Sequence, residues 1–518
     1  MSIATRQHRT KGRALHATKP FKAGQVIATF TPLLLLPTLS HITSVCTYCL
    51  RASSPRPCSR CRAAYYCDAK CQAAAWSAGH DRECAALVAN VPQSKRRRQI
   101  PTPVRALIQT LLAGQDLAAS VDGLEGHAAQ RRKTKGWADL EMMAMGACAF
   151  SGSGSSEDVV RRAVDVLCKI QTNAFHRYDA DLGQVGIFLE PTLAMANHSC
   201  IPNAMVQFVG RKAILRAERD MKQDDEIEIS YTDYTDPLLS RQQSLSPYNF
   251  ECSCRRCQDD LTVYQVCASS NVELNQYSLA ADTQKLRIDA SIPSEKIATA
   301  RSQCTAMPDL PQDLHQRKAM LQTQLSACQS LIAQDLWAVS PLPQTLTETS
   351  IYFAEEGDYA SALAVASLVA SRCDPFRFVA PFHPVRAKNL FMIVKLLSNT
   401  AAETSANTAV QSKTSLAQRL QSALREIDQV SLSQMLLYMV LDSAPAAYAK
   451  EWDLAVLAQE IMDGIDGLQG REQELSLIRA WRGKPAEDKN KAFFEYAVVQ
   501  QVEVLAELGK SVIAEFST

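Results

Sequence analysis

The chain has 518 residues, of which 47% are hydrophobic and 21% are charged, and its formal net charge is +1 at pH 7. This composition is typical of a globular protein and excludes a largely disordered chain, and the length suggests about two to four domains. No stretch approaches the roughly 18 uninterrupted apolar residues of a membrane span, and residues 1–6 lack the apolar run of a secretory signal, so we expect an intracellular protein of cytoplasm and nucleus with no membrane partner.

The first half of the chain alternates between strand-like segments, helices and cysteine clusters. Residues 1–45 predict short strands and turns, residues 46–84 hold a cysteine cluster, and residues 85–171 predict helices joined by glycine- and serine-rich linkers. From residue 172 to 233 the pattern is again that of short strands. The strands that we expect are 26–30, 186–189, 204–208, 213–215 and 226–231.

The second half of the chain is expected to be helical. A second cysteine run occupies residues 234–259, and helical periodicity then continues over 260–518, with a break at 357–358 and a helix over 384–397. Paired helices of this kind resemble tetratricopeptide units, and a plain helical bundle is the alternative. Residues 261–518 carry 22 basic and 29 acidic side chains. This acidity could attract a basic peptide, or it could belong to solvated helix faces.

The first cysteine cluster has the spacing of metal ligands. Its four pairs are Cys-x₂-Cys, Cys-x₂-Cys, Cys-x₃-Cys and His-x₃-Cys, which supply eight ligands and fill two tetrahedral zinc sites without an open position. A closed ligand set indicates structural zinc, and a module of about 40 residues depends on the metal for its folding free energy. The ligands are Cys46, Cys49, Cys58, Cys61, Cys67, Cys71, His80 and Cys84.

A second set of four cysteines predicts a third zinc site. Cys200 ends the run Asn197-His198-Ser199-Cys200, and it can complete one tetrahedral Cys₄ site with three cysteines further along the chain. The metal would position Asn197 and His198 through Cys200. Tyr231, at the end of a short apolar strand, would face the same pocket. The three later cysteines are Cys252, Cys254 and Cys257.

The spacing over residues 46–84 resembles that of a MYND zinc finger. In that family the ligand pairs alternate between the two metals. The resemblance therefore places one set of four on one zinc ion and the other set on the second. MYND fingers usually bind proline-rich peptides or help to place a basic surface near nucleic acid, and a purely structural role is the alternative. The first set is Cys46, Cys49, Cys67 and Cys71, and the second is Cys58, Cys61, His80 and Cys84.

A MYND finger inserted between an N-terminal β segment and an Asn-His-Ser-Cys motif resembles the SMYD family of SET- and MYND-domain lysine methyltransferases. The motifs cover residues 9–258 in order. The resemblance implies an α+β fold in which a β-rich SET domain is interrupted by the finger and a helical insert and is followed by an all-α, tetratricopeptide-like domain. The implied parts are 1–45 and 172–233 for the SET domain, 46–84 for the finger, 85–171 for the insert, 234–259 for the post-SET zinc segment and 260–518 for the helical domain.

The resemblance also implies the roles of single residues. Tyr231 corresponds to the catalytic tyrosine, and Phe175 and Tyr248 correspond to the substrate channel. Gly12 permits a close approach of the backbone to the cofactor, and this chain has Ala14 where a second glycine is usual. The implied contacts to S-adenosylmethionine are Lys11, Gly12, Arg13, Asn173, Asn197, His198, Tyr231 and Phe250.

The function that the resemblance implies is S-adenosylmethionine-dependent protein-lysine N-methylation, with three Zn²⁺ ions and a histone or non-histone protein as substrate. Transfer of a methyl group from a sulfonium to an amine is an in-line displacement, so the protein mainly binds and aligns the reactants and excludes water from the site. An aromatic channel favours the neutral amine that attacks. The cofactor already carries the activated methyl group, so we expect His198 to be a cofactor contact and not a general base.

Two other functions stay open at this point. The first is a catalytically weak scaffold that recruits protein partners, with chromatin as one place of recruitment, and Ala14 is its support. The second is direct nucleic-acid binding, which rests on the basic block Lys95-Arg96-Arg97-Arg98 and on the finger. This second function lacks a recognition helix with regular base-contact spacing.

Overall fold

The computed structural model describes residues 2–8, 11–90, 100–113, 115–179, 183–270, 279, 291–302, 304–405 and 415–517. The basic block at residues 95–98 lies outside these ranges. The chain divides into two compact units, and each is treated by itself. Unit 1 comprises residues 1–217, 221–232 and 242–252, and unit 2 comprises residues 218–220, 233–241 and 253–518. The bounds of the six parts inferred from the sequence stay predictions.

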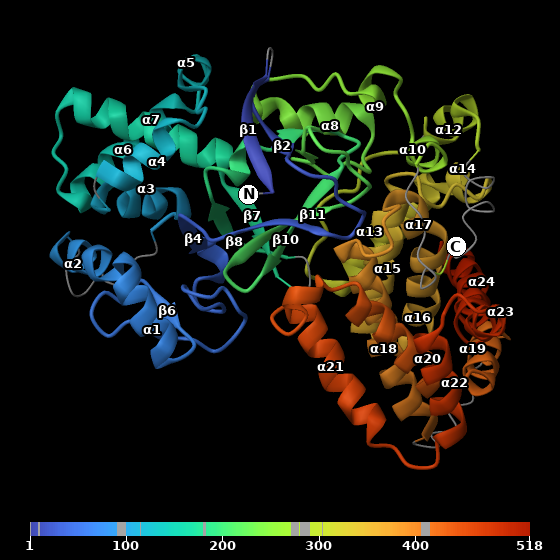
Figure 1. Ribbon diagram of the computed structural model, residues 1–518. Helices are drawn as coiled ribbons and strands as arrows, with labels where there is room; N and C mark the ends of the chain where they lie inside the picture. The colour runs from blue at the N-terminus through green and yellow to red at the C-terminus, as the bar shows by residue number, and fades with distance from the viewer. Residues whose placement is uncertain are drawn as a thin grey trace. The chain divides into compact units, whose positions relative to one another are not determined.

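Unit 1 contains small sheets (Figure 1). The hairpin of β1 and β2 is antiparallel, and Gly12 begins β2 with a φ of 78°, a conformation that glycine adopts without strain. Two three-stranded antiparallel sheets have the orders β10-β11-β3 and β4-β8-β7, and β9 pairs in parallel with β12. The strands are β1 Ile3–His8, β2 Gly12–Ala17, β3 Val26–Phe30, β4 Leu34–Pro37, β5 Arg56–Pro57, β6 Tyr65–Tyr66, β7 Phe175–Tyr178, β8 Gln184–Leu189, β9 Asn197–His198, β10 Ala204–Val209, β11 Lys212–Ala217 and β12 Glu228–Ile229.

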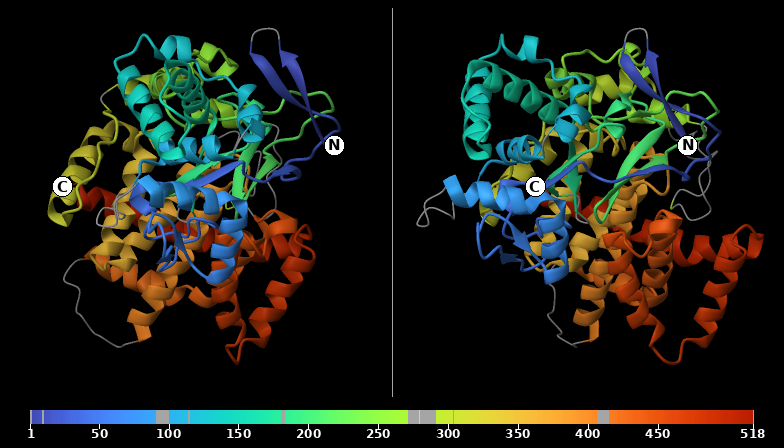
Figure 2. Two further views of the ribbon diagram at one scale, coloured as in Figure 1. Left: turned by 90° about the vertical axis from the view of Figure 1, so that its left-hand side faces the viewer. Right: turned by 60° about the vertical axis from the view of Figure 1, so that its left-hand side comes forward.

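The helices of unit 1 lie mainly in the predicted insert. Helix α7 begins after Ser156 with two acidic residues in its first turn, which suits the positive end of the helix dipole. It packs along α6, and the two run side by side in Figures 1 and 2. The apolar faces of α3, α6 and α7 share one hydrophobic cluster with Leu36 of β4. The helices are α1 Ala69–Ala75, α2 Asp81–Asn90, α3 Thr102–Leu112, α4 Gln115–Asp122, α5 Ala128–Arg131, α6 Trp137–Ser151 and α7 Glu157–Asn173.

A separate hydrophobic cluster lies among the strands that carry the candidate site. Leu15, Phe188 and Leu215, from β2, β8 and β11, are fully buried in it. Phe175 and Tyr231 border this cluster and are partly buried. Phe175 and Tyr231, two predicted site residues that are far apart in the sequence, therefore border the same packed region of unit 1.

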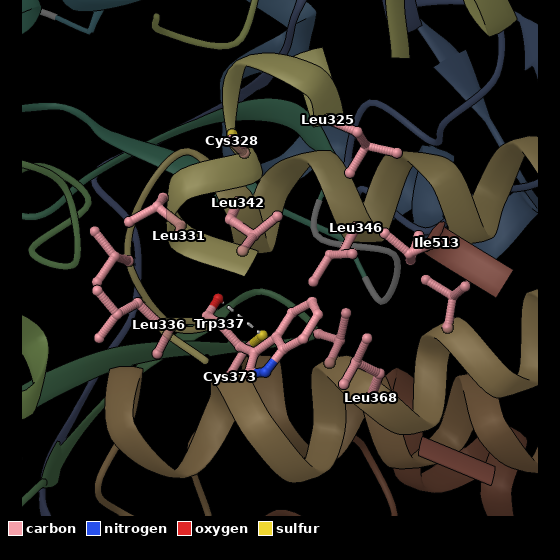
Figure 3. Packing of buried hydrophobic residues seen from close by; sticks show 14 of the residues in the cluster. Leu325, Cys328, Leu331, Leu336, Trp337, Leu342, Leu346, Leu368, Cys373 and Ile513 are labelled. Atoms are coloured by element: carbon pink, nitrogen blue, oxygen red, sulfur yellow. Dashed lines mark hydrogen bonds between the residues drawn. The ribbon is translucent and has the colours of Figure 1, made fainter. Parts of the chain in front are cut away.

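Unit 2 is helical. Glycine at 509 lets α24 approach α16 closely, because a β-carbon there would collide with the backbone of Ala364. Figure 3 shows its core, in which Cys373 and Trp337 are linked by a hydrogen bond from the thiol to the backbone carbonyl (3.3 Å). Helix α8, Leu238–Leu245, crosses the division between the units. The other helices are α9 Arg255–Gln258, α10 Val263–Ala268, α12 Ser294–Arg301, α13 Leu314–Ala327, α14 Gln329–Ile332, α15 Leu342–Glu355, α16 Tyr359–Leu368, α17 Asp374–Arg377, α18 Pro384–Ser405, α19 Ser415–Glu426, α20 Gln429–Asp442, α21 Asp453–Asp466, α22 Glu472–Gly483, α23 Asp488–Phe494 and α24 Gln500–Phe516.

The fold is α+β with a helical C-terminal region, as the sequence predicts. The predicted break falls between α15 and α16, where Gly357 has a φ of 82° and Asp358 caps the second helix. The tetratricopeptide likeness stays an expectation. One strand was predicted too long: residues 226–231 form only the short strand β12, because its parallel pairing with β9 extends over two residues. Tyr231 therefore lies beyond the strand, in the bend that follows it. Among the described residues, no helix combines the length and apolar character needed to cross a bilayer.

A buried carboxyl group in unit 2 gives the protein a testable pH dependence. Burial raises the pKa of Glu218 from its ordinary value of 4.5 to about 7, against the opposing effects of Arg219 and of a hydrogen bond from Tyr234 Oη (3.0 Å). Between these two values the folded protein keeps a proton that the unfolded chain has lost. The free energy of unfolding should therefore fall as the pH rises through this interval, by up to about 3 kcal/mol, and then level off.

The variant Glu218→Gln isolates this contribution. It keeps a polar side chain of the same size but cannot ionise. Its melting temperature relative to the wild type should be higher at pH 8 than at pH 5, as measured by thermal unfolding at both values. A difference between the two proteins that does not change with pH would contradict the prediction.

Candidate functional site

The first four predicted ligands of the finger lie together. The sulfur atoms of Cys46, Cys49, Cys67 and Cys71 are all within 4.8 Å of one another, and Cys49 Sγ lies 3.9 Å from Cys67 Sγ. Helix α1 presents Cys71, because Asp68 caps the helix by accepting a hydrogen bond from the Cys71 amide (2.7 Å). Four thiolate donors at this separation fit a tetrahedral zinc ion.

The other four predicted ligands form a second, buried cluster. Cys58, Cys61, His80 and Cys84 bring their ligand atoms within 4.8 Å of one another, and Cys61 Sγ lies 3.7 Å from His80 Nε2. The two sets alternate along the chain in the way that the resemblance implies. Three sulfurs and one imidazole nitrogen also fit tetrahedral zinc.

A carboxylate that the sequence reasoning missed supports this second cluster. Glu83 Oε2 lies 2.7 Å from His80 Nδ1, so it holds the ring with Nε2 directed at the three thiols. Arg105 of α3 donates to both carboxylate oxygens of Glu83, at 2.6 and 3.0 Å, and also to the carbonyl of Ala63 in the finger. Burial alone would favour the neutral acid, but the Arg105 charge and the His80 hydrogen bond hold the pKa of Glu83 far below its usual value. The available signal was a carboxylate three residues after a zinc-ligating histidine on a helix.

We expect Arg105→Gln to weaken zinc retention at this cluster. The change leaves Glu83 buried without its cation, and a supporting shell of this kind typically accounts for about 10- to 100-fold in metal affinity. Zinc release to a chromophoric chelator should therefore show one ion per chain leaving faster. Arg82→Gln is the matched control, because Arg82 is next to Glu83 and also binds α3, through the carbonyl of Leu112 (3.1 Å). Within the described part of the chain, the Glu83 carboxylate is bonded to His80, Arg105 and Gln109 instead. Equal release from both variants would contradict the expectation.

The third set of cysteines also comes together. The sulfurs of Cys200, Cys252, Cys254 and Cys257 lie within 4.8 Å of one another. Gln242 of α8 holds Cys252 by a pair of hydrogen bonds to its backbone, at 2.8 and 3.0 Å. The Cys₄ donor set fits a third zinc ion, so the three clusters together fit the three zinc sites expected from the sequence.

His198 links this third cluster to Tyr231. Its Nδ1 accepts a hydrogen bond from the Tyr231 amide (3.0 Å), and its Nε2 lies 3.3 Å from Cys200 Sγ. An imidazole whose Nδ1 accepts carries its proton on Nε2, where it faces the sulfur. Both nitrogens of His198 are therefore engaged, which leaves it poorly placed to act as a general base.

Aromatic rings surround Tyr231. The ring centroid of Tyr231 lies 4.9 Å from that of Tyr248, 5.3 Å from that of His198 and 6.4 Å from that of Phe250. Its hydroxyl donates to the carbonyl of Ala196 (2.6 Å), and burial raises the pKa of Tyr231 far above its usual value. The phenol is thus neutral, with its proton committed and its oxygen lone pairs free to accept a hydrogen bond.

Three of the predicted cofactor residues, Arg13, Asn173 and Asn197, are connected through backbone carbonyls and one neighbouring segment. Asn197 Nδ2 donates to the carbonyl of Arg13 (3.2 Å), and Asn173 Nδ2 donates to the carbonyl of Glu125 (2.7 Å). A β-carbon at Gly123 would lie 3.0 Å from the Arg13 guanidinium, so the segment around Gly123 and Glu125 lies beside this group. Sequence reasoning missed that segment, which carries no motif of its own.

Two further residues from the sequence analysis, Phe175 and Ala14, lie in strands of unit 1. Phe175 pairs with Phe188 across β7 and β8 and borders the same hydrophobic cluster as Tyr231, but none of the described ring contacts joins it to Tyr231. Ala14, the departure from the family pattern, is fully buried in β2 and pairs with Arg6 of β1. Its methyl group is accommodated in the strand core, whereas the positive φ belongs to Gly12. Ala14, which was the strongest sequence support for an inactive scaffold, is therefore a buried core residue.

Comparison with known proteins finds similarity to the finger and to relatives that match about half of the chain. The MYND finger family model matches residues 46–84. The SET domain and MYND-type zinc finger protein 6 of Schizosaccharomyces pombe is 30% identical over 254 residues, which are 48% of this chain and 51% of that protein. Human histone-lysine N-methyltransferase SMYD3 is 31% identical over 269 residues (48% and 59%), and human N-lysine methyltransferase SMYD2 is 28% identical over 260 residues (48% and 58%). The matched part spans between half and three-fifths of these relatives.

Proposed function

We propose that this chain, whose membership of the SET- and MYND-domain (SMYD) family is supported by the finger and by these relatives, is an S-adenosylmethionine-dependent protein-lysine N-methyltransferase. The observation that carries the proposal is the arrangement around Tyr231. A cluster of aromatic rings adjoins the Asn197-His198 loop, and Cys200 of that loop joins a Cys₄ cluster. Two relatives that match about half of this chain are named as lysine methyltransferases.

This cluster of rings suits an attacking lysine amine. The rings of Tyr231, Tyr248 and Phe250 desolvate an amine and so favour its neutral form, which has the lone pair needed for attack. The Tyr231 hydroxyl, held by the Ala196 carbonyl, can accept a hydrogen bond from the amine and turn that lone pair toward the donor. S-adenosylmethionine supplies the activated methyl group, and the residues that would hold it are Lys11, Gly12, Arg13, Asn173, Asn197, His198 and Phe250.

The substrate and partners are further parts of the proposal. A protein lysine is the substrate class, by likeness to the relatives. A proline-rich peptide is the proposed partner of the finger, and the support is Trp76, which is 36% exposed at the end of α1 beside the Arg60 guanidinium (5.7 Å). Exposed aromatic side chains are the usual docking surface for proline-rich segments. We propose a location in cytoplasm and nucleus, which fluorescence imaging of the tagged protein would test.

The deciding experiment measures binding and transfer in sequence. Calorimetry with S-adenosylmethionine tests the donor site, and incubation with methyl-labelled S-adenosylmethionine and a proteome extract, read by mass spectrometry, tests transfer. We expect binding and label on lysine side chains of extract proteins. Binding without any transfer would support the scaffold alternative, and absence of binding by the zinc-loaded protein would refute the proposed function.

A further inference from the structure

We propose that Glu226 is a positioning residue of the donor site, which orients the Asn197 side chain and anchors the Lys11 ammonium. This role rests on the proposed function, because it acts through two residues that are expected to contact S-adenosylmethionine. Glu226 itself has no motif in the sequence and was not among the expected site residues. It lies just before β12, on the segment that leads to Tyr231.

Glu226 fixes the orientation of the Asn197 side-chain amide. Asn197 Nδ2 donates to Glu226 Oε1 at 2.8 Å and to the Arg13 carbonyl at 3.2 Å. An amide nitrogen carries two hydrogens, so both are engaged in these contacts. The Asn197 Oδ1 atom must then point away from both partners, where it can accept a hydrogen bond from a ligand. Without an acceptor at Glu226, an orientation with Asn197 Oδ1 and Nδ2 exchanged would cost far less free energy.

The same carboxylate holds Lys11. Lys11 Nζ lies 3.1 Å from Glu226 Oε2 and 2.7 Å from Glu228 Oε1. Partial burial opposes the charge on Lys11, but the hydrogen bonds and charges of Glu228 and Glu226 raise its pKa above the ordinary value. The Lys11 ammonium, in the turn between β1 and β2, is thereby tied to the segment that also holds Asn197. Two segments far apart in the sequence share one anchor.

The backbone at Glu226 is secured without its side chain. Asn203 Nδ2 donates to the Glu226 carbonyl (2.8 Å), and Asn203 Oδ1 accepts from the Glu228 amide (2.8 Å). The amide of Ile227 donates to the Leu15 carbonyl (2.7 Å). Replacing the Glu226 side chain should therefore leave the strand in place, so that its effect on ligand binding can be measured in a folded protein.

Glu228 provides a matched comparison. It is the same residue type, two positions away, and it shares the contact with Lys11. Glu226 differs from it by the hydrogen bond from the Asn197 side chain. A change that removes either carboxylate removes one negative charge beside Lys11, and a larger effect of the Glu226 change reports on the orientation of Asn197.

The test compares Glu226→Leu, Glu226→Gln and Glu228→Leu in the full-length, zinc-loaded protein, with calorimetry for S-adenosylmethionine binding and steady-state kinetics. Loss of a charged hydrogen bond corresponds to about tenfold or more in affinity. We expect Glu226→Leu to raise the Kd and the KM for S-adenosylmethionine by at least about tenfold, with kcat at saturation within about threefold. Glu226→Gln, which keeps an acceptor oxygen, should recover part of this loss. Glu228→Leu removes a Lys11 contact but leaves the Asn197 hydrogen bond, so it should raise the Kd by clearly less than Glu226→Leu does.

A double-mutant comparison tests the route of action. If Glu226 acts partly through Asn197, Glu226→Leu should cost distinctly less in an Asn197→Ala background than in the wild type. Equal costs in both backgrounds, or equal effects of Glu226→Leu and Glu228→Leu, would overturn the role of Glu226 while leaving the proposed function intact. Absence of S-adenosylmethionine binding by the wild type would refute the proposed function, and this role with it.

Discussion

Tyr231→Phe is expected to abolish methyl transfer while the protein keeps its three zinc sites and its affinity for S-adenosylmethionine. The ring contacts of Tyr231 with Tyr248 and His198 survive the substitution, because they belong to the aromatic ring. The oxygen that the Ala196 hydrogen bond holds in place is lost, and with it the acceptor for the attacking amine. Removing one such preorganised group typically lowers kcat by about 10²- to 10³-fold.

The measurement is the transfer of labelled methyl groups under single-turnover conditions, together with zinc content by elemental analysis. Tyr65→Phe is the matched control, because it removes a phenolic hydroxyl from β6 in the finger, which is not part of the ring cluster around Tyr231. This control should transfer methyl groups at the wild-type rate. Activity of Tyr231→Phe equal to that of the wild type would remove Tyr231 from its assigned role.

Cys200→Ser is expected to damage the donor and acceptor sides of the site together. Cys200 belongs to the third zinc cluster and also lies against His198, which in turn receives the Tyr231 amide hydrogen bond. Loss of the metal removes the support of the Asn197-His198 loop. Metal binding of this kind also contributes directly to folding free energy. We expect the zinc content to fall from three to two ions per chain, with at least about tenfold weaker S-adenosylmethionine binding and almost no transfer.

Elemental analysis, calorimetry and the transfer assay check these three results on one preparation. Cys304→Ser is the control, because Cys304 lies outside the three clusters and its thiol contacts the backbone of α12 and α13. It should retain three zinc ions. Wild-type binding and transfer by a Cys200→Ser protein that holds only two would show that the third metal does not support the site.

The chemistry of the three metal clusters could be inferred from the sequence because a closed set of thiolate and imidazole ligands leaves few alternatives once the spacing is known. The same holds for elements with a strong local signal. The break before Asp358 and the strand Val26–Phe30 lie where turn residues and apolar periodicity place them. The predicted strand over 226–231 was too long, because strand length is set by the partner strand and β9 offers only two residues.

The supports of the site depended on tertiary structure. Glu83 bonds to Arg105 of another helix, and Glu226 bonds to Lys11, which is far away in the sequence. The Tyr231 hydroxyl donates to the Ala196 carbonyl. The residue types by themselves indicated metal ligands, an aromatic channel and a candidate catalytic tyrosine. Packing alone decided which carboxylate faces which cation and which carbonyl receives the phenol, because contacts between distant segments arise from the mutual burial of strands and helices and leave no periodic pattern along the chain.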